Sequence, residues 1–316
     1  MSFIKQKDID YLNKKLSEYK YDGIIFFISD KKYSIYVKPL ACSLFLFSEN
    51  WLIIFIHLGN FKFNYPYKEN LFEITIDLPK KNQFSGDIKT YCANIRVPIL
   101  FELTTKLNVR KIVYTDVDNI LVKDLNQLFT DKNFYIRKVN LNLVDKLVNN
   151  SSKIMHYKSG VIILKSKESK FLKDEKKIIK FVKNYQEFCL KDFEKWFADQ
   201  LALSKTFTKI PSLKKYSYVD KKVCDWDLSP FSFFWAAKGY IKDTILWKII
   251  SKKVILFSIL KKYFLIKNSK LCIKIIILID SVFNLCIFPL ILLRYKFFDF
   301  IFRFIRFILK KLLIKF

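Results

Sequence analysis

Short apolar runs that end in polar turns recur along much of the chain, and they constrain its fold more than any other feature. Between them lie stretches with the apolar spacing of helices. Apolar strands that alternate with helices are typical of an α/β domain with a mostly parallel sheet that is covered on both faces. Five runs are predicted as strands: residues 22–30, 51–60, 71–79, 110–118 and 159–166. Three stretches are predicted as helical: residues 32–47, 90–104 and 167–206.

The charge of the chain is strongly positive, because 57 lysines and arginines against 29 acids give a formal net charge of +28. Nearly all of the excess is lysine. Two explanations stay open, a compositional bias or a surface that attracts phosphates, nucleic acid or anionic lipid. The 2 histidines disfavour a Ser-His-Asp hydrolase or a His-rich metal site, and His57, which follows an apolar strand, is expected to be structural. Scattered cysteines and a polar N-terminus favour a reducing, cytoplasmic location.

The composition becomes basic and apolar toward the C-terminus, which divides the chain into two regions. Residues 1–245 are predicted as the α/β domain, and residues 246–316 as a helical, membrane-associating region. Residues 271–293 have transmembrane length, but charged and helix-breaking residues disfavour a true span. These interrupting residues are Lys274, Asp280, Asn284 and Pro289. In residues 295–316 charges recur every three or four positions opposite Phe, Ile and Leu. Such a basic amphipathic helix binds an anionic membrane interface, here the inner face of the cell membrane.

Two aspartates, Asp116 and Asp118, stand one residue apart where the fourth predicted strand ends. Ligands of open α/β sheets bind beyond the carboxyl ends of the strands. A turn at this position can bring both carboxylates onto one cation, and oxygen ligands suit a hard ion such as Mn²⁺ or Mg²⁺. The alternative is that the two acids belong only to a turn or a helix cap.

The stretch KIVYTDVDNILVKDLNQLF, which contains this pair, resembles the strand, the D-x-D motif and the following segment of the retaining glycosyltransferases of family 8, the galactosyltransferase and glycogenin group. The N-terminal stretch IIFFISDKKYSIYVKPLACSL fits the family's first strand and its base-binding loop. Four further stretches fall in the family's order: YCANIRVPILFEL, YKSGVIILK, FADQLALS and WAAKGYIKDT. The resemblance covers roughly residues 22–245 and implies a GT-A fold, a mostly parallel sheet with flanking helices.

The resemblance also implies roles for individual residues. Asp116 and Asp118 would bind Mn²⁺ or Mg²⁺, and Asp199 and Gln200 would act in catalysis by placing the transferring sugar. The donor would be a nucleotide-diphosphate sugar, with a UDP-sugar favoured. The residues implied in binding it are Ser29, Asp30, Tyr33, Arg96, Asp116, Lys158, Ser159, Gly160, Gly239 and Lys242.

Two positions depart from the family pattern. Ala236 replaces a histidine that is the third metal ligand in the family, and Asp225 or Asp227 could take its place. Lys158 replaces an asparagine of the strand that lines the donor sugar, so it could bind a phosphate or an acidic sugar instead. Both departures put strict metal dependence in doubt.

The implied function is transfer of a hexose to a lipid-linked or surface-glycan acceptor at the cytoplasmic face of the membrane. Two other functions stay open, a basic nucleic-acid-binding protein and a non-catalytic, membrane-associated relative of the fold. Nucleic acid is not expected as a partner, because the aromatic residues are mainly Phe in apolar runs and no nucleic-acid motif is present. Single residues also have structural alternatives: Arg96 as a surface helix charge, Asp199 as a cap or an exposed acid, and Lys242 as a solvated lysine.

Overall fold

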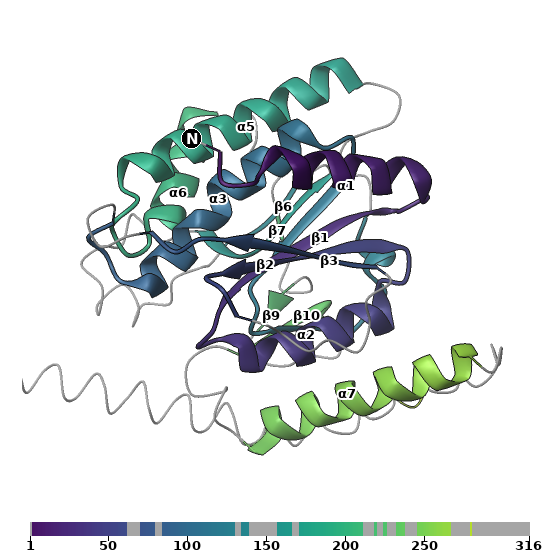
Figure 1. Cartoon of the computed structure of the whole chain (residues 1–316). Helices are drawn as coiled ribbons and strands as arrows, with labels where there is room; N and C mark the ends of the chain where they lie inside the picture. Colours follow the sequence, from purple (N-terminus) through teal and green to yellow (C-terminus); the bar gives the residue numbers. More distant parts are fainter. Residues whose placement is uncertain are drawn as a thin grey trace, which may run out of the picture.

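A seven-stranded sheet forms the centre of the protein in a computed structural model of the chain (Figure 1). The sheet has the order β3-β2-β1-β4-β7-β6-β8, and four of its six neighbouring pairs are parallel. The strands are β1 Gly23–Asp30, β2 Trp51–Leu58, β3 Leu71–Ile76, β4 Lys111–Thr115, β6 Phe134–Lys138, β7 Tyr157–Lys165 and β8 Tyr218–Val219. The structure describes residues 2–61, 70–79, 84–129, 134–138, 157–165, 171–210, 218–219, 224–225, 232–237, 245–266 and 279.

Helices cover both faces of this sheet (Figure 1). The side chains of β1 alternate between the two layers: Ile24 and Phe26 pack under α1, α3, α5 and α6, whereas Ile25 and Phe27 face α2 and α7. β1 and β2 therefore need continuous apolar runs, because these strands are buried on both sides. The helices are α1 Gln6–Glu18, α2 Ser34–Phe47, α3 Ile88–Lys106, α5 Phe171–Lys191, α6 Ala198–Lys209 and α7 Ile245–Ile266, with a 3₁₀ turn η1 at Leu125–Leu128.

A second, three-stranded sheet lies on the α2 side, in the order β5-β10-β9. Its strands are β5 Asn119–Leu121, β9 Cys224–Asp225 and β10 Phe234–Ala236. β10 pairs antiparallel with β5, so that Ala236 lies opposite Asn119, and parallel with β9, so that Trp235 lies beside Asp225. Because β5 follows directly after Asp118, this sheet brings a distant part of the chain to the end of β4.

The predicted mixed α/β fold with a mostly parallel sheet is confirmed, and each of the five predicted strands is present. The prediction of one helical segment over residues 167–206 is wrong in one respect, because residues 192–197 form a turn between α5 and α6. No Gly or Pro marks this break. Phe197, the residue before α6, has φ 69°, in the left-handed region that non-glycine residues seldom occupy.

The helix α7, which begins the region predicted to associate with membranes, packs against α2. Trp247, Ile250 and Val254 belong to the core on that face of the sheet. Within the described ranges no helix combines the length and the apolarity that crossing a bilayer requires. The segment 271–293 and the amphipathic segment 295–316 lie outside the described residues, apart from residue 279.

His57 is a buried strand-end residue, as predicted, and its surroundings disfavour a positive charge. It stacks close to Phe55, with ring centroids 3.9 Å apart. Oε2 of Glu73 lies 2.8 Å from Nε2, yet neither ring nitrogen has a hydrogen-bond partner among the described residues, so the carboxylate lies off the N–H direction. Burial lowers the pKa of His57, and the charge of Glu73 only partly opposes this shift.

We expect the free energy of unfolding to decrease as the pH falls below 6.5, the ordinary pKa of histidine. In that window the unfolded chain binds a proton at His57 that the folded chain does not, whereas above it both states are neutral. The slope should approach but not exceed about 1.4 kcal/mol per pH unit. Urea unfolding between pH values of about 7.5 and 5.5 measures it. His57→Gln should flatten the slope and His156→Gln should keep it; an unchanged slope in His57→Gln would contradict the assignment.

Candidate active site at the carboxyl ends of β1 and β4

The strand order reverses between β1 and β4. The chain leaves β1 through α2 to β2 on one side, and it returns from β3 through α3 to β4 on the other side, with α2 and α3 on opposite faces (Figure 1). Parallel neighbours end at the same sheet edge, and a reversal of this kind opens a crevice for ligands there. The predicted donor-binding residues of β1 lie at this edge: Asp30 Oδ1 accepts the N–H of Tyr33 at 2.9 Å, and the Ser29 hydroxyl donates to the Asp30 carbonyl at 3.0 Å.

The guanidinium of Arg96, on α3, joins the D-x-D motif to the Asp-Gln pair. Nη1 donates to Oδ1 of Asp116 at 2.7 Å, and Nη2 donates to Oδ2 of Asp199 at 2.6 Å. The Tyr114 hydroxyl donates to the same Asp116 oxygen at 2.8 Å. Arg96 is 7% exposed and Asp199 1% exposed, so the readings of Arg96 as a surface charge and of Asp199 as an exposed acid are wrong. We call Arg96, Asp116, Asp199 and Tyr114 the Arg96 cluster.

The electrostatics of the Arg96 cluster keep the guanidinium charged. Burial works against its charge, but Asp199, Tyr114 and Asp116 outweigh this and raise the pKa of Arg96 well above its ordinary value. Burial also raises the pKa of the Tyr114 hydroxyl, so it stays protonated and can donate. With Asp118, the cluster combines three carboxylates and one guanidinium. Its formal charge is therefore negative in a strongly basic protein, which favours binding of a cation.

Asn94, two residues before Arg96, holds the turn from which Asp199 projects. Its side chain is fully buried. Oδ1 accepts the N–H of Asp199 at 3.2 Å, and Nδ2 donates to two carbonyls of the α5–α6 turn, at 2.6 and 3.1 Å. The turn includes Phe197 in its left-handed conformation. Helix α3 therefore holds the start of α6 at two points. The side chain of Asn94 binds the backbone of the turn and of Asp199, and the guanidinium of Arg96 binds the carboxylate of Asp199.

The D-x-D turn is held by backbone contacts with β7 and β10. The N–H of Asp116 donates to the Gly160 carbonyl at 2.8 Å, which places the predicted donor residue Gly160 directly beside the motif. The N–H of Ala237 donates to the Asp118 carbonyl at 2.9 Å. Ala236, which pairs opposite Asn119 in the small sheet, consequently lies near Asp118. Its methyl side chain offers no ligand.

The donors at this turn fit a divalent cation that also binds a substrate phosphate. Asp118 is 6% exposed, and Oδ1 of Asp116 is bound by Arg96 and Tyr114. Mg²⁺ and similar ions are commonly held by one or two carboxylates together with phosphate oxygens. Among the described residues no third His, Cys, Asp or Glu completes a site made of protein groups alone. Asp225 pairs beside Trp235 in the small sheet, but its side chain, like Asp227, lies outside the description.

The remaining predicted residues divide into three groups. Gln200 follows Asp199 in α6, and its Oε1 is buried without a hydrogen-bond partner among the described residues. Lys158 and Ser159 belong to β7, but their side chains are not described. Gly239 and Lys242 lie outside the described residues. Their proximity to the Arg96 cluster stays a prediction.

Sequence reasoning missed three buried polar residues beside Arg96. Tyr114 and Asn94 bind members of the cluster or its turn. Tyr185, on α5, is fully buried and its hydroxyl has no hydrogen-bond partner in the described part of the chain. Burial raises the pKa of Tyr185, and Asp199 adds to the shift. The sequence did contain a signal for Tyr114 and Asn94: each places a hydroxyl or an amide within an apolar strand or helix, where a buried polar group must find a partner.

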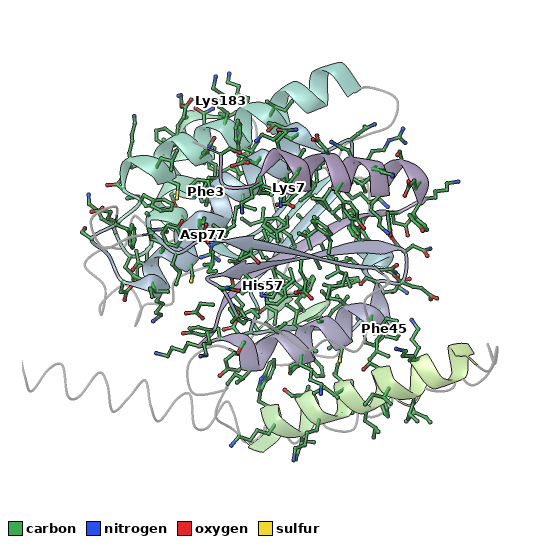
Figure 2. All side chains as sticks on the ribbon, viewed as in Figure 1. Phe3, Lys7, Phe45, His57, Asp77 and Lys183 are labelled. Atoms are coloured by element: carbon green, nitrogen blue, oxygen red, sulfur yellow. The ribbon has the colours of Figure 1, made fainter. Side chains whose placement is uncertain are left out.

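A cavity of about 1100 Å³ borders the α5–α6 turn on its other side. It runs between the N-terminal residues, the end of β3 and α3, and Figure 2 labels Phe3 and Asp77 on its walls. Aromatic rings and charges of both signs line it, with Tyr91 and Phe193 packed edge to face at 5.7 Å between centroids. None of its described lining residues belongs to the predicted donor site.

Comparison with protein families and with curated proteins gives no match. Among solved structures, the galactosyltransferase LgtC in complex with donor and acceptor sugar analogs has 17% identity and a TM-score of 0.45, over 64% of this chain and 74% of that one. WbbM, a bifunctional glycosyltransferase, has 11% identity and a TM-score of 0.44, over 74% and 52%. The glycosyltransferase GlyE of Streptococcus pneumoniae TIGR4 has 12% identity and a TM-score of 0.44, over 77% and 64%.

Proposed function

We propose that this protein is a glycosyltransferase of the family 8 type that moves a hexose from a nucleotide-diphosphate sugar, favoured as a UDP-sugar, to an acceptor with retention of configuration. One observation carries the proposal. The D-x-D motif stands where the strand order reverses, and Arg96 joins one of its carboxylates, that of Asp116, to Asp199 of the Asp-Gln pair, which lies 103 residues after Arg96 in the chain. An ion pair that only stabilises the fold does not have to lie at the strand ends where the order reverses.

The residues of the cluster suggest a division of roles. Asp116 and Asp118 would hold Mn²⁺ or Mg²⁺, which when bound neutralises charge on the diphosphate leaving group. Asp199 is buried against Arg96, so we assign it to positioning. Gln200 offers an unpaired carbonyl oxygen, which can accept a hydrogen bond from a sugar hydroxyl. Ser29, Asp30 and Tyr33 would contact the base, and Gly239 and Lys242 the diphosphate, as the sequence resemblance implies.

The acceptor and the location form the second part of the proposal. The basic, aromatic segment 295–316 would hold the enzyme at the inner face of the cell membrane, and a lipid-linked or surface glycan is then the natural acceptor. The alternative of a non-catalytic relative is favoured by the two departures from the family pattern, Ala236 and Lys158. Nucleic-acid binding has no comparable support, because the aromatic residues are mainly Phe in apolar runs and the sequence contains no nucleic-acid motif.

Thermal unfolding of the full-length protein with a panel of nucleotide sugars tests the donor assignment. A matching nucleotide sugar should raise the unfolding temperature with Mn²⁺ present and much less with EDTA, because a ligand that binds only the folded state stabilises it. The corresponding nucleoside monophosphate, which lacks the second phosphate, is the matched ligand control. Absence of any shift across UDP-, GDP-, ADP- and TDP-sugars would contradict the proposal.

A further inference from the structure

Helix α7 presents aliphatic and basic side chains to the outside of the folded domain. Ile249, Leu256 and Ile259 are 45%, 53% and 51% exposed. At 3.6 residues per turn these three residues, with the exposed Lys248 and Lys252, fall within an arc of about 100°. We call these five residues the outer face of α7. Among the described elements no other carries three exposed large aliphatic side chains.

The opposite face of α7 is fixed to the domain, which determines the direction of the outer face. Trp247, Ile250 and Val254 are buried against α2. Lys261 is buried too, and its ammonium donates to the carbonyls of Phe45 and Leu46, at 3.1 and 3.2 Å. These are the last carbonyls of α2, where a cation is favourable. Figure 2 shows Phe45 on the side of α2 that faces α7. The outer face therefore cannot turn inward without breaking these contacts.

We propose that the outer face of α7 binds the surface of an anionic bilayer. The outer face carries Lys248 and Lys252, and the helix contains no acid, so the charge of this face complements anionic head groups, while its aliphatic side chains can enter the acyl boundary. A second copy of the chain is a poorer occupant. In a twofold contact each α7 would meet the same lysines, in a protein that already carries a net charge of +28. A nucleic acid would use the lysines but not the three aliphatic side chains.

This inference is independent of the proposed sugar transfer, and it adds a membrane contact inside the folded domain to the one expected from residues 295–316. A contact on a packed helix orients the domain on the bilayer. A terminal segment by itself only tethers it.

Sedimentation of the full-length protein with vesicles tests the inference. The vesicles contain phosphatidylglycerol and phosphatidylcholine, or phosphatidylcholine alone. Leu256→Ser/Ile259→Ser should lower the partition coefficient onto the anionic vesicles about tenfold, and Lys248→Gln/Lys252→Gln should lower it by a similar factor. The matched control is Ile179→Ser/Leu190→Ser, which removes two exposed aliphatic side chains from α5 and should change it less than twofold.

Each possible outcome of the sedimentation experiment and its controls supports or overturns the inference. Undiminished binding by the two α7 double variants would overturn the inference and leave the terminal segment as the sole membrane contact. A concentration-dependent dimer that these substitutions dissociate, or a loss of RNA retention equal to the loss of vesicle binding, would overturn it in favour of another occupant. Nucleotide-sugar binding without vesicles should be unchanged in every variant, so failure of the membrane inference and failure of the proposed function are distinguishable.

Discussion

Replacing Arg96 with methionine should lower the free energy of unfolding by about 3–5 kcal/mol, the usual cost of removing one partner from a buried ion pair. The reason is that the guanidinium serves two carboxylates, Asp116 at 2.7 Å and Asp199 at 2.6 Å. Asp199 is almost fully buried, so water cannot replace the lost partner. Urea unfolding followed by circular dichroism measures the change.

Three further variants separate the ion pair from general effects of the substitution. Arg110→Met changes an exposed arginine just before β4, and it should cost less than about 0.5 kcal/mol. Asp199→Asn in the Arg96→Met background should recover part of the loss, because the unpaired charge is then gone. Arg96→Lys keeps a charge but not the fork that reaches both acids, so it should be intermediate. A loss below about 1 kcal/mol in Arg96→Met would show that the cluster is not a structural ion pair.

The predictability of the fold depended on the length of each element. β1 and β2 are eight-residue apolar runs that are buried on both faces, so their pattern alone identifies them. β5, β9 and β10 have two or three residues, too few for a period to be read, and they form because the chain returns to the end of β4. The turn between α5 and α6 lacks a local breaker and is stabilised by Asn94, about 100 residues earlier in the chain.

Three members of the candidate site were predicted from the sequence, but their connections were not. The resemblance identified Arg96, Asp116 and Asp199 as site residues, and the structure brings these three together. The sequence could not predict that Arg96 donates to both acids, since an arginine at this position of a helix is equally compatible with an exposed side chain. The role of Tyr114 could not be predicted for a similar reason. A tyrosine in an apolar strand is interpreted as a core residue until the partner of its hydroxyl is known.

Asp118→Asn should reduce nucleotide-sugar turnover by at least about 100-fold. Arg96 donates to Asp116 and Asp199, so an isosteric amide at position 118 removes a charge and the proposed cation ligand and leaves these two ion pairs in place. Interactions aimed at the developing charge of a leaving group are each worth factors of about 10²–10³. Asp116→Asn should differ: it also weakens the contacts with Arg96 and Tyr114, so both turnover and the free energy of unfolding should fall. Donor hydrolysis and urea unfolding, measured on both variants, give the comparison.

The contrast between Asp118→Asn and Asp116→Asn is the discriminating result. If the turn has only a structural purpose, Asp116→Asn should reduce turnover more than Asp118→Asn does. If the acids only stabilise the turn, Asp118→Asn would leave the response to Mn²⁺ intact and turnover above about one tenth of the wild-type value. Asp10→Asn, an exposed acid on α1, controls for the loss of one negative charge and should keep turnover within about twofold. A metal-diphosphate site requires that Asp118→Asn reduces turnover at least as much as Asp116→Asn does, although Asp116 also binds Arg96 and Tyr114.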